Sequence, residues 1–267
     1  VSSYQNIENF CLEGVILTIR LSKPIPPNKQ ITFFIQYALN LPLQGGGLGY
    51  TNKQINAGDW YPFIPPYVNE KGWIIHPPSA VGEYLVYDKA NYHVRLTILN
   101  NDDAIIAASA KVIPTLTGGE FSSSNSRNIS FSISDEYKVM TKQFGNFTVM
   151  GFYFPDNNSA ASASVELTGE ALLLFSDLFN CAYPHETITI VESDFQDGME
   201  YDGLYFLSQD YFKSYDGSFQ NYLSVLSIHE TAHQWWYGIV ANDQALEPWL
   251  DEALATYSEL LFIEYYY

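Results

Sequence analysis

The pattern of the sequence changes about halfway along the chain, and this change limits the folds that are open to it. Up to about Ser134, short segments rich in β-branched and aromatic residues alternate with turn clusters such as "KPIPPNK" and "LQGGGLG", which is typical of antiparallel strands. Beyond that point, strand-like and helix-like segments are mixed, and the last two segments are helical. We therefore predict an α+β fold, with a β-rich amino-terminal domain over residues 1–134 and a second domain, a small sheet plus helices, over residues 135–267.

The individual elements follow from residue type and periodicity. In the first domain we expect strands at residues 14–22, 30–39, 92–99 and 128–134. In the second domain we expect strands at 147–154, 187–193 and 203–212, and helices at 163–179, 218–240 and 247–267. The segment "TGGEFSSSNSRN" falls near the domain boundary and is compatible with a link between domains or with a hairpin loop of the first one.

Charge and cysteine content restrict the partners of the protein. The 12 basic and 30 acidic residues give a formal net charge of −18. This charge disfavours nucleic acid and anionic lipid surfaces and suits a cationic ligand group, although excess acid also simply keeps a surface soluble. No segment approaches the roughly 18 uncharged apolar residues of a membrane span. Cys11 and Cys181 permit one disulfide or two free thiols, which leaves the compartment and the oligomeric state open. Because Val1 is not followed by a signal segment, we expect a processed or excised piece.

Two histidines stand four residues apart in "SIHETAHQWW", within a predicted helix. Residues four apart lie on one helical face, so His229 and His233 can direct both imidazoles at one point, as a metal ion requires. Glu230 lies about 100 degrees round the helix from His229, where it can contact a metal-bound water without ligating the metal itself. Taken alone, this spacing is also compatible with a solvated helix face.

A third ligand candidate, Glu252, follows 19 residues after His233 in "WLDEALATY". It lies on the next predicted helix, after a short turn, so an antiparallel neighbour can bring its carboxylate back to the two imidazoles. Two imidazole nitrogens, one carboxylate oxygen and a fourth position for water form the ligand set of a hydrolytic zinc site, whereas structural zinc sites more often use cysteines. We therefore predict that His229, His233 and Glu252 bind Zn²⁺.

The segment "HETAHQWWYGIV…PWLDEALATYSE" resembles the signature of the gluzincin metallopeptidases, and specifically that of the aminopeptidase N family. Members of the family typically read "HQWFG" after the second histidine and "WLNEGFA" around the later glutamate, so Asp251 and Ala253 are mild departures. The resemblance is strong over residues 185–264 and weak before them. It implies a zinc-dependent aminopeptidase with Glu230 as the general base, built from a β-rich domain followed by a thermolysin-like catalytic subdomain.

A second motif points to the same family. The segment "DGMEYDG" resembles the family's "GAMEN", with Gly198 and Tyr201 where Ala and Asn are usual. In the family the glutamate of this motif binds the free α-amino group of the substrate, which implies that role for Glu200. An extended peptide can pair with a strand edge here, so the backbone at Gly198 and Met199 would position the first peptide unit. A carboxylate at the end of the cleft would neutralise the ammonium group and stop a longer chain from passing.

The resemblance also implies that parts of the family's machinery lie beyond Tyr267. The oxyanion-stabilising tyrosine and the helical domain would follow that residue, so we expect a catalytic subdomain that is truncated at its carboxy end. Residues 1–267 alone are then expected to bind metal but to hydrolyse peptides weakly. Two other functions stay open: a thermolysin-type endopeptidase, which shares the ligands but not the amine-binding motif, and a non-catalytic relative used for binding or scaffolding.

The residues around the predicted ligands have expected roles of their own. Carboxylates or carbonyls should accept hydrogen bonds from the far nitrogens of the two histidines. Glu259 is the candidate, because it lies seven residues after Glu252 and hence on the same helix face. We expect Trp235, Trp236 and Trp249 to pack in the core. The remaining histidines are expected to be structural or exposed, without a role in metal binding: His76, His93 and His185.

Overall fold

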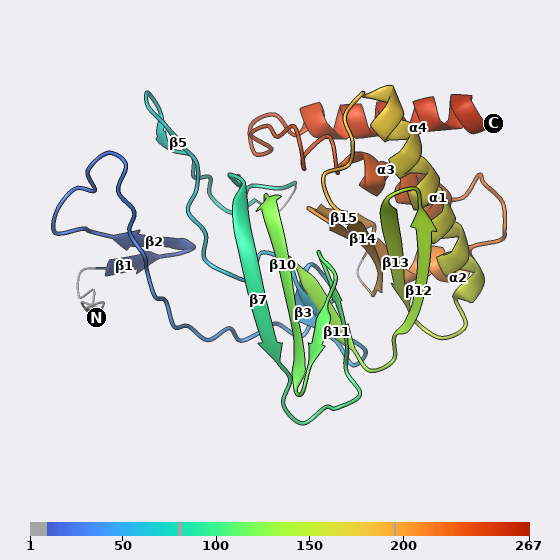
Figure 1. Cartoon of the computed structure of the whole chain (residues 1–267), viewed down its shortest axis with the longest axis horizontal. Coiled ribbons are helices and arrows are strands. Elements are labelled where there is room, and N and C mark those ends of the chain that lie inside the picture. The colour runs from blue at the N-terminus through green and yellow to red at the C-terminus, as the bar shows by residue number, and fades with distance from the viewer. Residues whose placement is uncertain (1–9, 80–81, 195) are drawn as a thin grey trace. The chain divides into compact units, whose positions relative to one another are not determined.

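The computed structural model describes residues 10–79, 82–194 and 196–267 (Figure 1). The chain divides into two compact units, residues 1–40 and residues 41–267. Within the described residues, several mostly antiparallel sheets are combined with four helices, which confirms the predicted α+β class. None of the described helices has both the length and the apolar composition that crossing a membrane would require.

The described residues of the first unit, 10–40, contain one short hairpin. Strand β1 (Phe10–Glu13) pairs in antiparallel fashion with β2 (Ile16–Ile19). The strand predicted at residues 14–22 is therefore present but shorter. The strand predicted at residues 30–39 is wrong, since these residues form no strand within the described part of the chain. Strand propensity reflects packing against neighbouring strands, and a segment that pairs with none stays irregular whatever its composition.

The second unit begins with two antiparallel sheets. One contains β3 (Leu48–Tyr50), β4 (Ile55–Ala57), β11 (Phe131–Ser134) and β8 (Ile105–Ala108), in that order. The other contains β7 (Ala90–Thr97), β10 (Gly118–Ser126) and β9 (Ile113–Thr115), and a separate hairpin pairs β5 (Tyr67–Val68) with β6 (Gly72–Trp73). Strands of both sheets contribute to one buried apolar cluster: Ala57, Val94, Ile106, Ala108, Phe121, Ile129 and Phe131. The segment "TGGEFSSSNSRN" is neither a link nor a loop, because most of it forms β10.

A five-stranded mixed sheet follows. Its order is β12 (Lys138–Phe144), β13 (Phe147–Tyr153), β14 (Thr187–Ser193), β16 (Leu204–Ser208) and β15 (Gly198–Tyr201). Strands β13, β14 and β16 are parallel, whereas β12 and β15 run antiparallel to their neighbours at the two edges. The connection from β13 to β14 is α1 (Asn158–Leu178), since parallel neighbours need a crossover. Strand β15 thus has a sheet edge that no strand of the described chain covers.

Three more helices complete the unit: α2 (Gln209–Ser214), α3 (Tyr222–Ala232) and α4 (Trp249–Tyr266). In Figure 1, α1, α3 and α4 lie together beside the five-stranded sheet, away from β7 and β10. The core between this sheet and the helices is apolar and includes Val165, Phe175, Ile188, Ile228 and Phe262. The metal-binding candidates on α3 and α4 are therefore held by two helices that share one core.

Two helix boundaries differ from the prediction. The strand predicted at 203–212 ends at Ser208, because the hydroxyl of Ser208 accepts a hydrogen bond from the backbone N–H of Asp210 and caps α2. The helix predicted at 218–240 begins only after the N-cap Asn221 and ends at Ala232. Beyond it, Tyr237 has φ +138°, which no helix permits. The helices predicted at 163–179 and 247–267 are confirmed as α1 and α4.

Two side chains from outside the helix donate hydrogen bonds to Tyr237 in this irregular conformation. Nε of Arg127 donates to the backbone oxygen of Tyr237 at 2.7 Å, and Nδ2 of Asn128 donates to its hydroxyl at 2.6 Å. Both donors come from the segment between β10 and β11. The sequence pattern of residues 218–240 could not reveal this, since the partners lie about 110 residues away.

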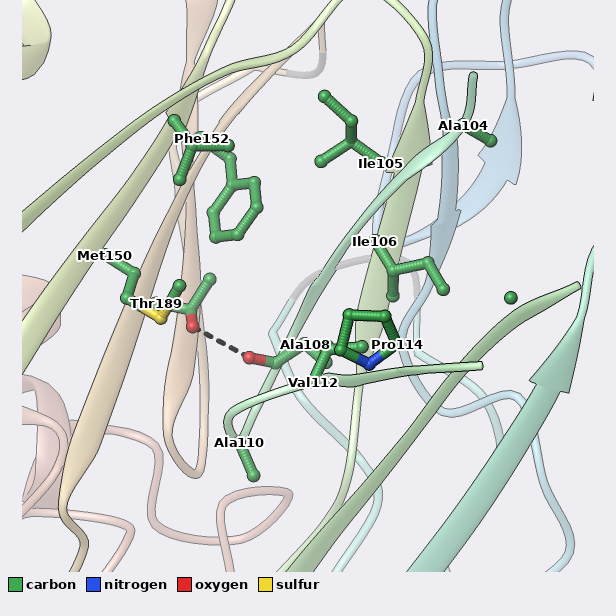
Figure 2. Close-up of a pocket in the computed structure, with 12 residues that line it drawn as sticks. Ala104, Ile105, Ile106, Ala108, Ala110, Val112, Pro114, Met150, Phe152 and Thr189 are labelled. Carbon is green, nitrogen blue, oxygen red and sulfur yellow. Dashed lines mark hydrogen bonds between the residues drawn. The ribbon is translucent and has the colours of Figure 1, made fainter. Parts of the chain in front are cut away.

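An apolar cavity of about 310 Å³ lies where β8 approaches the five-stranded sheet (Figure 2). The hydroxyl of Thr189 on β14 donates to the backbone oxygen of Ala108 on β8 at 2.7 Å and links its two sides. The walls include Ile105, Ile106, Met150 and Phe152, and none of the lining residues is ionisable. Acid–base or metal chemistry must therefore lie elsewhere.

Glu192 on β14 provides a test of the core. Its fully buried carboxylate accepts hydrogen bonds from the backbone N–H of Phe154 at 2.8 Å and from Nδ2 of Asn157 at 2.6 Å. Burial raises the pKa of Glu192 from its ordinary 4.5 to about 7. A raised carboxyl pKa means that the folded state holds the proton more tightly than the unfolded state. The contribution of Glu192 is then complete below pH 4.5 and lost as the pH rises through 7.

We therefore expect the free energy of unfolding to fall by about 2 to 3 kcal/mol from this group between pH 4.5 and pH 8. Glu192→Gln should remove that part of the pH dependence and be more stable than the parent at pH 8. Urea unfolding across this pH range measures both quantities. Glu166→Gln, on the surface of α1, is the control. An unchanged pH dependence in Glu192→Gln would show that the carboxyl group titrates alike in both states.

Candidate metal centre

The ends of α3 and α4 bring the three predicted ligands together. His229 lies in the last turn of α3, and His233 is the residue that caps its carboxy end, with its N–H bonded to the carbonyl of His229 at 3.2 Å. Glu252 lies in the first turn of α4. The loop between the helices, residues 233–248, is short enough for the start of α4 to face the end of α3.

The ligand atoms converge on one point. Nε2 of His229 lies 3.0 Å from Nε2 of His233 and 3.2 Å from Oε2 of Glu252, and the remaining distance, from Nε2 of His233 to Oε1 of Glu252, is 3.8 Å. His233 is fully buried, whereas 47% of the Glu252 side chain is exposed. The cluster therefore opens to solvent on the side of α4.

Both histidines are oriented by hydrogen bonds at their other nitrogen. Nδ1 of His229 donates to Oε1 of Glu259 at 2.5 Å, and Nδ1 of His233 donates to the backbone oxygen of Trp236 at 3.0 Å. These contacts confirm the expected outer partners and the candidate Glu259. Because both acceptors require a proton on Nδ1, the Nε2 atom of each imidazole is the one that can offer a lone pair to a metal ion.

The pKa shifts of the cluster residues also indicate that the site favours a cation. Burial alone lowers the pKa of His229, but its hydrogen bonds to Glu252 and Glu259 outweigh this effect and raise the pKa to about 10. Burial lowers the pKa of His233 to about 4. The hydrogen bond to His229 lowers the pKa of Glu252. The carboxylates thus favour one positive charge at His229, and a divalent cation held by the two Nε2 atoms and Glu252 would supply it. The residues fit a zinc ion of the hydrolytic kind.

Glu230 lies beside the cluster without joining it. Its side chain is 4% exposed, and Oε2 has no hydrogen-bond partner among the described residues. Burial raises the pKa of Glu230 to about 8, although the charge of His229 opposes the shift. A Cβ atom on Gly198 would lie only 2.0 Å from Oε1 of Glu230, so any larger residue at this position would displace the Glu230 carboxylate. Gly198 therefore shapes the space that the Glu230 carboxylate occupies.

Glu200, on β15, reaches the same place from the sheet. Its carboxylate, the imidazole of His233 and the carboxylate of Asp251 form a buried group whose ligand atoms lie within 4.8 Å of one another. Burial, reinforced by the charge of Glu230, raises the pKa of Glu200 well above its usual range. Nε2 of Gln244 donates to Oε1 of Glu200 at 3.3 Å. The sequence prediction missed Gln244 and gave Asp251 no role, although its position next to Glu252 was a usable signal.

Alternation along β15 separates its predicted binding residues. Glu200 faces α3, whereas the side chain of Met199 packs on the opposite face with the apolar cluster that contains Phe152 and Phe206. Met199 can therefore serve a substrate only through its backbone, at the free edge of β15.

The other aromatic and histidine residues behave mostly as expected. Trp235 is buried, and Nε1 of Trp236 donates to the hydroxyl of Ser258 at 3.0 Å. The prediction for Trp249 is wrong, since 62% of this residue is exposed at the start of α4. The remaining histidines lie outside the cluster, with His76 bonded to Asp243, His93 to Ser122 and His185 to Asp202.

Comparisons with known proteins give results for the carboxy-terminal part of the chain. Residues 163–267 match the peptidase family M1 domain. Aminopeptidase N of Rattus norvegicus is 36% identical over 108 residues, which cover 38% of this chain and 11% of that protein. The match thus spans about a tenth of the length of this relative. The family match includes most of α1 and all of β14 to α4, and therefore every residue of the candidate metal centre. Residues 163–267, which hold the whole candidate metal centre, are thus similar to the peptidase family M1 domain and to part of aminopeptidase N.

Proposed function

We propose that this protein is a zinc-dependent aminopeptidase that removes amino-terminal residues from peptides. The observation that carries the proposal is the position of Glu200, whose carboxylate lies within 4.8 Å of a ligand atom of His233. His233 then belongs both to the candidate cation site, with His229 and Glu252, and to the candidate ammonium site around Glu200. The M1 family match and the similarity to aminopeptidase N support the same activity.

The zinc ligands would be His229, His233 and Glu252. When bound, zinc acts as a Lewis acid that polarises the scissile carbonyl and activates water. Glu259 and the carbonyl of Trp236 hold the two imidazoles in the orientation that ligation needs. The exposure of Glu252 leaves the open side on which water and substrate can approach.

Glu230 would be the general base and then the general acid. Its unpartnered Oε2 is free to accept a proton from the attacking water and to deliver it to the leaving amine. Glu230 neighbours His229 in sequence, but it does not belong to either group of described residues that could hold a metal ion. Its buried position leaves it available for proton transfer, since no side chain of the described residues bonds to Oε2.

Geometry favours an exopeptidase over an endopeptidase. In a peptide, the terminal nitrogen and the first carbonyl oxygen are separated by three bonds, or about 3 Å. An ammonium group on Glu200 therefore leaves only the first carbonyl within reach of the cation site next to His233. The backbone at Gly198 and Met199, on the free edge of β15, would align that first peptide unit. An endopeptidase of the thermolysin type has no use for a buried carboxylate at this point.

The proposal includes the organisation of the chain. We propose a β-rich domain over residues 1–134 and a thermolysin-like catalytic subdomain over residues 135–267. The apolar cluster around Phe121 lies before residue 134, and the cluster around Phe175 lies after residue 148. A third cluster, which includes Ala107 and Phe152, joins the two parts.

Substrates with blocked amino termini test this function. In the intact protein, acetylated peptides should be poor substrates, and Glu200→Gln should lower kcat/KM for free amino termini by well over tenfold, because one partner of a buried charge pair typically contributes about 2 to 5 kcal/mol. Glu186→Gln, an exposed change, is the control. Equal cleavage of free and acetylated peptides would favour the endopeptidase, and a zinc-loaded protein without any turnover would favour the binding or scaffold relative.

A further inference from the structure

The loop between α3 and α4 places an amide side chain between the two buried carboxylates of the site. Gln244 is 4% exposed. Its Nε2 donates to Oδ2 of Asp251 at 2.6 Å and to Oε1 of Glu200 at 3.3 Å. An amide nitrogen carries two hydrogens, so both are used, one for each carboxylate. The pair Glu200 and Asp251 thus has a common donor.

These two carboxylates need such a donor to stay close together. Glu200 is 5% exposed and Asp251 is 3% exposed. Like charges in a poorly screened interior repel strongly at short distance. Asn242, on the same loop, also donates to Asp251, at 3.4 Å to Oδ1, but makes no hydrogen bond to Glu200 among the described contacts. Gln244 is therefore the bridge between the strand β15 and the start of α4.

The backbone that carries Gln244 is itself anchored. The carbonyl of Asp243 accepts hydrogen bonds from the N–H groups of Leu246 and Glu247, at 3.0 and 2.8 Å. The side chain of Asp243 lies 2.8 Å from Nε2 of His76, in the segment after β6. The loop is fixed on both sides of Gln244, so the amide is directed at the carboxylates and has little freedom to turn away.

We infer that Gln244 is a positioning residue for the substrate's amino group: it holds Oε1 of Glu200 and thereby directs Oε2 at the ammonium, with Asp251 as the second carboxylate of the same pocket. This inference rests on the proposed aminopeptidase function. It assigns to Gln244 an effect on the binding of free amines and no part in bond cleavage. Asp251 contributes negative charge at a position where the resembling family usually has a neutral asparagine.

The experiment replaces the donor without changing the length of the side chain. In the intact protein, Gln244→Met should raise KM for free-amine peptides by about ten- to a hundredfold, the range expected when a buried acceptor loses its donor, and leave kcat within about threefold. Inhibition by acetohydroxamate, which binds metal and carries no amine, should not change, nor should zinc content. Calorimetric titration with leucinamide should show the same weakening as KM. Asn242→Leu is the matched control, since it also removes a loop amide from Asp251 but leaves Glu200 untouched.

The possible outcomes separate this inference from the function on which it rests. Equal losses in KM, kcat and acetohydroxamate inhibition would mean that Gln244 only holds the fold, and unchanged KM would mean that it has no role. A parent protein that fails to bind leucinamide, or that cleaves acetylated peptides equally well, would overturn the proposed function as well. If Gln244→Met does not fold, Gln244→Leu removes the donor with a side chain of similar volume and no charge, so it should weaken leucinamide binding to the same degree.

Discussion

Replacement of His233 by alanine is expected to remove the metal and nearly all turnover. His233 is buried, and its Nε2 lies 3.0 Å from that of His229, so its loss would leave the candidate site with a single imidazole. The loss of Lewis-acid stabilisation amounts to several kcal/mol, roughly a thousandfold in kcat or more. Glu252→Ala should have the same effect on metal content with less effect on stability, because Glu252 is about half exposed. Elemental analysis of purified protein gives the zinc content, and His93→Ala, on the surface of β7, is the control.

The ligand assignment depends on that result. A double variant His233→Ala, Glu252→Ala that still carries one zinc per chain would place the metal elsewhere. Loss of zinc with retained turnover would mean that hydrolysis uses other residues.

Glu230→Gln is expected to separate metal binding from catalysis. Glutamine fits the space beside Gly198 but cannot accept and return a proton, so kcat should fall by about a hundred- to ten-thousandfold while zinc content stays unchanged. Gly198→Ala should also lower kcat, since its Cβ would lie 2.0 Å from Oε1 of Glu230 and displace the carboxylate. Steady-state kinetics and elemental analysis on the same samples measure both quantities. Glu264→Gln, exposed near the end of α4, is the control. Turnover by Glu230→Gln within tenfold of the parent would show that another group activates the water.

The convergence of the candidate ligands was predictable because the information for it is local in the sequence. His229 and His233 are four apart on a helix, and Glu252 and Glu259 are seven apart on another, so helix geometry alone places each pair on one face. One further assumption, that the helices are antiparallel neighbours, brings the pairs together, and the contacts His229–Glu252 and His229–Glu259 agree with it. The β-strands with strong alternation, such as β7 and β11, were found for a similar reason.

Features that depend on distant partners could not be predicted in this way. The irregular backbone after α3 includes Tyr237, which accepts hydrogen bonds from Arg127 and Asn128, far away in the sequence. Trp249 is exposed because α4 packs on the core through other residues. The hydrophobicity of Trp249 alone does not reveal which face of the helix packs. Gln244 resembles any polar loop residue until β15 and α4 are placed on either side of it.

The meeting of the two helix ends has an electrostatic consequence. The peptide dipoles of a helix add up to about half a positive charge at its amino end and half a negative charge at its carboxy end. The carboxy end of α3 carries the histidines, and the amino end of α4 carries Asp251 and Glu252. The dipole of α4 therefore favours ionised carboxylates in its first turn, and the dipole of α3 favours a cation beside its last turn. Both backbone fields are present as soon as the helices dock, so the site is arranged for a cation before any ion arrives.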